Sequence, residues 1–112
     1  MALQRAILEL GAGSALHSGD YTQAAIRAVD DAIHHSSLTF LRSLNIDPED
    51  MQITVTLGVQ KPDQVDKEAV KARLPHGRIT VNAVKGGLDV PDPEGDGPTV
   101  IASAGIEVHI DI

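Results

Sequence analysis

The C-terminal end of the chain alternates between apolar residues and polar or small ones, a pattern that suits an extended strand and not a helix. Every second position is apolar: Ala102, Ala104, Ile106, Val108, Ile110 and Ile112. Successive side chains of a strand point to opposite faces of a sheet, so these residues share one face and those between them share the other. The chain therefore has to fold around a sheet with one buried face and one wetter face.

Three other segments are predicted to join this sheet. Residues 51–59 and about 78–84 show the same period of two, and residues 4–10 contain an apolar run that ends abruptly at a glycine. A helix is expected over about residues 21–44, with an apolar stripe of Ala25, Val29, Ala32 and Ile33. A short second helix over about residues 67–73 would be capped by Asp66.

The order of these elements is β-α-β-α-β-β, which we interpret as a single α+β domain (α/β-like, two layers) over residues 1–112. It predicts a mixed four-stranded sheet with two helices on one face. Right-handed crossovers would make the first three strands parallel and the last strand antiparallel to them. Residues 89–98 hold three of the six prolines and are expected to form a mobile loop.

The composition limits the classes of partner. A formal net charge of -7 disfavours nucleic acid, because affinity for phosphates comes from Lys and Arg. No long apolar run or export signal is present, so no membrane partner is expected and a cytoplasmic location is the default. The chain has no cysteine, and its only aromatic residues are Tyr21 and Phe40. A core of small aliphatic side chains would gain from burying more surface in an oligomer.

Residues 9–22 are predicted to form the functional site. Two glycines after the first strand are expected to make a turn with unusual backbone angles, and the next helix would be capped by an Asp or Thr side chain. Such a turn presents free N–H groups to an anionic ligand group. The predicted ligand-binding residues of this stretch are Gly11, Gly13, Ser14, Ser18, Gly19, Asp20 and Thr22. The alternative is an ordinary strand-to-helix connection with ordinary caps.

Two further strand ends are expected to meet at the same edge, because ligands of parallel α/β sheets lie beyond the carboxyl ends of the strands. Lys61 follows one of these strands, and Lys85, Gly86 and Gly87 follow the other. Lys85 and the two glycines are predicted to bind ligand, and Lys61 is a candidate catalyst that activates a hydroxyl. The alternative for each lysine is a solvated loop residue. His17, in the first turn, is a candidate general acid or base.

Neither a metal nor a cofactor is expected. The sequence lacks a set of His, Cys, Asp or Glu residues with metal-ligand spacing. Leu16 occupies the position of the third glycine in a dinucleotide fingerprint, and no Gly-Lys-Ser/Thr follows.

These residues also carry a resemblance. Residues 11–19 (GAGSALHSG), the helix after them, and residues 59–66, 75–77 and 85–88 resemble a family of small uncharacterised bacterial and plant proteins. That family is marked by an N-terminal Gly-x-Gly-x-Asp-x-His-Gly motif, and the similarity covers nearly the whole chain. Ala15 stands where the motif has Asp, and Ser18 where it has Gly. The resemblance implies a motif role for His17 and brings no activity.

More distantly, residues 19–22, the following helix and residues 44–50 (LNIDPED) resemble one repeat of the ring-opening amidohydrolases cyanuric acid hydrolase and barbiturase. Those enzymes join three such units around a pseudo-threefold axis and use serine-lysine pairs. Thr56, Leu57 and Gly58 stand here where they have Ser-Gly-Gly. The order of elements is also similar to the Bacillus-type chorismate mutase fold, whose members are commonly trimers with sites between subunits. Both resemblances imply a homotrimer.

Two functions therefore stay open, each with a small molecule as the partner. The first is a trimeric enzyme with its sites at the trimer interfaces, which acts on a small anionic or cyclic amide metabolite as a ring-opening hydrolase or as a mutase-like or isomerase-like catalyst. The second is a non-catalytic metabolite-binding or regulatory module of the same fold. The residues at Ala15 and Thr56 favour the second, because a motif carboxylate and a nucleophilic serine are absent there.

Overall fold

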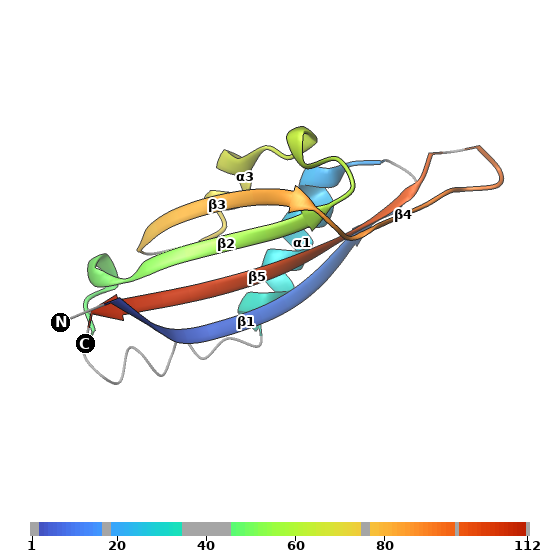
Figure 1. Cartoon of the computed structure of the whole chain (residues 1–112). Coiled ribbons are helices and arrows are strands. Elements are labelled where there is room, and N and C mark those ends of the chain that lie inside the picture. Colours follow the sequence, from blue (N-terminus) through green and yellow to red (C-terminus); the bar gives the residue numbers. More distant parts are fainter. Residues whose placement is uncertain (1–2, 17–18, 35–45, 75–76, 96, 112) are drawn as a thin grey trace.

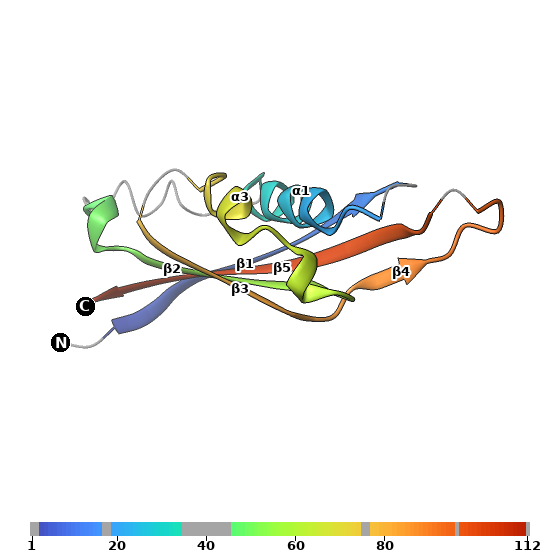
Figure 2. The same cartoon turned by 90° about the horizontal axis from the view of Figure 1, so that it is seen from above.

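One mixed sheet forms the body of the molecule, and two helices lie against one of its faces (Figures 1 and 2). The computed structural model describes residues 3–16, 19–34, 46–74, 77–95 and 97–111. In chain order the elements are β1 (Leu3–Ala15), α1 (Tyr21–His34), η1 (Pro48–Asp50), β2 (Gln52–Val59), η2 (Pro62–Gln64), α3 (Lys67–Lys71), β3 (Arg78–Lys85), β4 (Leu88–Val90) and β5 (Thr99–Asp111). None of the helices in the described ranges is long and apolar enough to cross a membrane.

The sheet has the strand order β1-β5-β2-β3, and β4 also pairs with β5. β5 is antiparallel to both β1 and β2, whereas β2 and β3 are parallel. β1, β2 and β3 therefore run in the same direction and β5 runs against them. This arrangement confirms the predicted α+β two-layer fold and the predicted strand directions.

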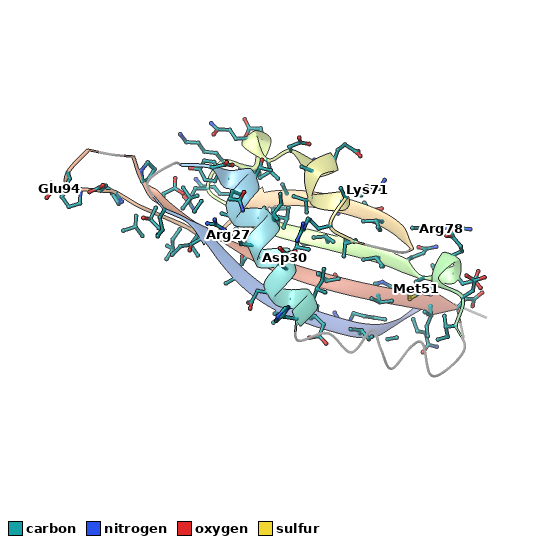
Figure 3. The ribbon with its side chains drawn as sticks, turned by 180° about the vertical axis from the view of Figure 1, so that it is seen from behind. Arg27, Asp30, Met51, Lys71, Arg78 and Glu94 are labelled. Carbon is teal, nitrogen blue, oxygen red and sulfur yellow. The ribbon has the colours of Figure 1, made fainter. Side chains whose placement is uncertain are left out.

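The predicted count of four strands is wrong by one, because residues 89–98 are not all loop. Leu88 and Val90 flank a polar residue, the alternation of a strand, and β4 pairs with the start of β5 through Leu88 to Ile101 and Val90 to Thr99. Three paired residues suffice for a short strand. The loop that follows carries Glu94 near its tip (Figure 3).

The helix limits were predicted in part. α3 begins at Lys67 as expected, and the Asp66 side chain caps it by accepting hydrogen bonds from the backbone N–H groups of Glu68 and Ala69. α1 begins at Tyr21 as expected and ends at His34. The remainder of the predicted first helix, residues 35–44, lies outside the described residues.

The core between sheet and helices consists mainly of small aliphatic side chains, as the composition indicated. Val55 and Leu57 of β2, Val29 of α1 and Val108 of β5 have no exposed surface. Tyr21 is the aromatic residue in this core among the described residues, and it is 4% exposed. Phe40 lies outside the described residues.

β1 and α1 approach each other more closely than side chains would normally allow. Gly11 and Gly13 lie within β1, and a Cβ atom added to them would lie 2.4 Å from the Ala28 carbonyl oxygen and 2.3 Å from the Ala28 nitrogen, respectively. Ala24 and Ala32, one turn to either side of Ala28, are fully buried. The backbones of the strand and the helix are therefore in direct contact.

The predicted turn at Gly11 and Gly13 is accordingly wrong. β1 continues to Ala15, and neither glycine has a positive φ, whereas Gly19 does, at 61°. The glycines are required by the close approach of α1 and not by an unusual backbone angle.

Side chains of α1 also bond to the outer edge of β1, which is an edge strand. The Ala12 backbone N–H donates to Asp31 Oδ2 at 3.0 Å, and Arg27 Nη1 donates to the Ser14 carbonyl oxygen at 2.6 Å. Arg27 lies on α1, on the side of the sheet that faces the reader in Figure 3. These bonds use backbone groups that would otherwise be free to pair with another strand.

The contact between β1 and α1 predicts a large effect of a single methyl group. Gly13→Ala is expected to lower the free energy of unfolding by about 2 kcal/mol or more, because the helix backbone has to move to admit the Cβ atom. Urea denaturation followed by circular dichroism measures this. Gly105→Ala is the control, because the nearest atom to its added Cβ is Leu10 Cδ2 at 3.7 Å, an ordinary contact. A similar loss in both variants would contradict the packing role of Gly13.

Candidate functional site

The carboxyl ends of the parallel strands and the first turn of α1 come together at one edge of the sheet. Thr22 Oγ1, in that first turn, accepts a hydrogen bond from the Asp66 backbone N–H at 2.9 Å, and it lies 3.4 Å from the Gln64 carbonyl oxygen. The Gly86 N–H, after β3, donates to the Val59 carbonyl oxygen at 2.9 Å. The chain segments that carry the predicted site residues are therefore linked to one another.

The N-terminus of α1 is capped as its sequence predicts. Asp20 Oδ1 accepts a hydrogen bond from the Gln23 backbone N–H at 3.0 Å. Gly19 has a φ of 61°, so the tight turn into the helix needs a glycine there. Of the predicted ligand-binding residues, Gly19, Asp20 and Thr22 therefore lie in this turn. Gly11, Gly13 and Ser14 lie instead in β1, against α1.

Gly86 and Gly87 allow the chain to cross closely over the end of β2. Gly87 has a φ of 63°, and a Cβ atom there would lie 2.1 Å from the Ile101 carbonyl oxygen. Gln60 Nε2 donates to the carbonyl oxygens of Gly86 and Gly87 at 3.0 and 3.2 Å. Both glycines thus have a packing role that accounts for them without a ligand.

The predicted charged and catalytic residues divide into two groups. Lys61 and Lys85 are exposed and lie at the edge described above. Lys61 follows β2, and Lys85 is the last residue of β3. His17 and Ser18 lie outside the described residues. Ala15, the position of the missing motif carboxylate, is buried at the end of β1.

A pair of polar residues that the sequence did not single out lies at this edge. The Tyr21 hydroxyl, at the first residue of α1, donates a short hydrogen bond to Asp89 Oδ2 in β4. Burial raises the pKa of the Tyr21 hydroxyl to about 12, and the hydrogen bond to Asp89 and its negative charge act in the same direction. The pair joins the start of α1 to the short strand that sequence analysis assigned to a loop.

The second oxygen of this carboxylate is unsatisfied. Asp89 Oδ1 is buried and has no hydrogen-bond partner among the residues that the structure describes. A buried acceptor without a donor costs about 1–3 kcal/mol, so native structures seldom leave one without a reason. The signal that could have found Asp89 is its place between Leu88 and Val90, because that alternation turns its side chain to the helix face.

A hollow of about 670 Å³ lies at another place, beside η1 and the start of β3. Its walls include Asp47, Asp50, Arg78 and Asp111, and none of the predicted site residues lines it. Arg78 and the neighbouring Met51 mark this end of the molecule in Figure 3. Within the described ranges, no three His, Cys, Asp or Glu residues are placed to hold a metal ion. The unsatisfied carboxylate therefore makes the edge at Tyr21 the stronger candidate.

Comparison with known proteins gives relatives but no activity. The chain matches a family described as "Conserved hypothetical protein (Lin0512_fam)" over residues 5–108. It is also similar to a crystal structure of an FtsZ-like protein of unknown function from Nostoc punctiforme PCC 73102. The two chains are 36% identical with a TM-score of 0.85, and the match covers 100% of this chain and 99% of that chain. No curated protein matches this chain.

The Tyr21 hydroxyl gives a direct spectroscopic test of the pair. Tyr21 is the single tyrosine of the chain, so tyrosinate absorbance reports this residue alone. The titration midpoint is expected near pH 12 in the folded protein and near the ordinary value of 10.0 in denaturant. Because the folded-state pKa is raised, the stabilisation is complete below pH 10 and is lost as the pH rises toward 12. A midpoint near 10 in the folded protein, with circular dichroism unchanged, would contradict the buried pair.

Replacement of the hydroxyl tests the same pair by stability. Tyr21→Phe is expected to lower the free energy of unfolding by about 1–3 kcal/mol at neutral pH, because both Asp89 oxygens then lack a donor. The difference from the wild-type chain should shrink between pH 10 and 12, where Tyr21 ionises. A difference that stays constant over this range would show that another group carries the effect.

Proposed function

We propose that this chain, which belongs to the Lin0512 family of conserved hypothetical proteins, binds a small molecule at the edge where Tyr21 and Asp89 meet. The bound group is an N–H donor, as in a cyclic amide. The observation that carries the proposal is the buried Oδ1 of Asp89, for which the described part of the chain supplies no hydrogen-bond partner.

The chemistry of the carboxylate favours a donor over an anion. An ionised carboxylate only accepts hydrogen bonds, and Tyr21 already supplies one to Oδ2. An amide N–H directed at Oδ1 would complete the group, whereas a phosphate or carboxylate ligand would meet like charge. Of the two ligand classes that the sequence left open, the cyclic amide is therefore the better supported.

Neighbouring groups can complete the recognition of such a compound. A cyclic amide presents carbonyl oxygens beside its N–H groups, and these accept hydrogen bonds. Lys61 and Lys85 are exposed cations at the same edge, and lysine donates only. We assign the two lysines as hydrogen-bond donors to the carbonyl oxygens of the ligand. Asp20 and Thr22 hold the first turn of α1 in place.

Binding is better supported than ring opening. The amidohydrolases that the sequence resembles use a serine that follows a strand, and Thr56 stands at the corresponding position here. Thr56 pairs with Asn82 and Gly105 on the sheet face away from the helices, whereas Tyr21 and Asp89 meet on the helix side. The hydroxyl that contacts Asp89 is that of Tyr21, which is already engaged in this hydrogen bond.

The proposal is tested by calorimetric titration and thermal shift with compounds that differ in one hydrogen. Uracil, hydantoin and cyanuric acid supply ring N–H groups, their N-methylated forms lack them, and inorganic phosphate represents an anion. Asp89→Asn is expected to weaken binding of the N–H compounds at least about tenfold, because its amide can place a donor where Oδ1 stood. Asp63→Asn, an exposed residue of η2 with the same change of charge, is the matched control and should bind as the wild type does.

Three outcomes would change the assignment. Equal binding of the N-methylated forms would show that Asp89 does not accept a hydrogen bond from the N–H group of the ligand, and the proposal would be wrong. Binding of phosphate alone, lost in Lys85→Met, would favour the anionic ligand. A ring-opened product in the same samples would replace the binding module with a hydrolase.

A further inference from the structure

We infer that the sheet face opposite to α1 and α3 is the surface on which copies of this chain associate. We call this surface the open face. It consists of the side chains that point away from the helices, namely those of the partner residues on the neighbouring strands and, in β5, those of Thr99, Ile101, Ser103, Gly105, Glu107 and His109. Figure 2 shows both helices on the other side, and no described element covers the open face. The inference concerns assembly and does not depend on the proposed ligand.

Large apolar side chains are exposed on this face. Leu10 of β1 is 67% exposed and Leu88 of β4 is 60% exposed, and Leu8, Val84 and Val90 each expose nearly half of their surface. The register places all five on the open face, because Leu8 and Leu10 oppose Glu107 and Gly105, and Leu88 opposes Ile101. A cluster of this kind on one face indicates an interaction surface, whereas single exposed leucines do not.

The chemistry of the face fits another copy of itself. Its polar part consists of Thr54, Thr56, Thr80 and Asn82, whose side chains both donate and accept hydrogen bonds. Its charges are of both signs and lie together at one end, where Arg5 is 3.8 Å and His109 is 3.9 Å from Glu107. A strongly acidic or basic partner would require one sign, whereas a twofold contact between two copies requires a face that complements itself.

The β4–β5 hairpin also favours a second copy of the chain as the partner that covers the open face. In Figures 1 and 2 the hairpin runs past the first turn of α1, and the register places Leu88 and Val90 on the face away from the helices. Leu88 and Val90 on this extension would be covered by a neighbouring copy lying across the open face.

Sedimentation velocity and light scattering test this inference on the full chain. The wild type is expected to sediment as a multiple of 11.8 kDa at micromolar concentration. Leu10→Glu and Leu88→Glu should each weaken association at least about 30-fold, because a charge would be buried between copies. Lys71→Glu, exposed on α3 on the helix side, is the control and should assemble as the wild type does. A monomeric wild type, or assembly that persists in both leucine variants, would overturn the inference.

A labelling experiment keeps the test decisive if a glutamate variant fails to fold. The chain has no cysteine, so Leu10→Cys and Lys71→Cys each introduce a single thiol. Maleimide should modify the thiol on α3 rapidly at every protein concentration. It should modify the thiol at position 10 more slowly as the concentration rises and the copies associate. Concentration-independent labelling at position 10 would contradict association through the open face.

Discussion

The fold depends on the direct contact between the backbones of β1 and α1. Gly11 and Gly13 bring no side chain to this contact, and Ala24, Ala28 and Ala32 bring one methyl group each. A helix this close to an edge strand can also bond to it, which Arg27 and Asp31 do. The contact fixes the axis of α1, and with it the position of Tyr21 at the edge of the sheet. An interface of small residues thus fixes the helix against the sheet, as large aromatic side chains do in other cores.

The strand directions could be predicted because they follow from periodicity and from the right-handed crossover, whereas the order of the strands within the sheet was not predicted. Alternation identified β2, β3 and β5, and Asp66 and Asp20 marked helix starts through local hydrogen bonds. The end of β1 could not be predicted in this way. The sequence alone does not distinguish a glycine in a strand from a glycine in a turn. Here the distinction comes from the helix that lies against Gly11 and Gly13. The spacing of Ala24, Ala28 and Ala32 at every fourth residue was the available signal.

The candidate site, like the end of β1, could be predicted from the sequence only in part. The predicted site and the Tyr21–Asp89 pair lie at the same edge of the sheet, because strand ends meet there whatever their side chains are. It assigned ligand binding to glycines that have packing roles: Gly86 and Gly87 let the chain cross β2, and Gln60 takes their carbonyl groups. Asp89 was missed because its partner, Tyr21, is 68 residues away in the sequence and the pairing depends on tertiary structure. A buried oxygen that lacks a donor is a property of the folded chain and has no sequence pattern.

The edges of the sheet decide how copies of the chain can meet. Addition of a strand at β1 is disfavoured, because Asp31 and Arg27 already occupy the Ala12 N–H and the Ser14 carbonyl oxygen. The opposite edge, β3, begins with Arg78 and ends with Lys85, and cations at an edge strand oppose pairing with the same strand of a second copy. With both edges protected, the uncovered surface that remains is the open face with its exposed leucines. Face-to-face packing would use Leu88 and Val90 of β4, whereas Asp89 between them points to the helix side, so the ligand edge borders the contact.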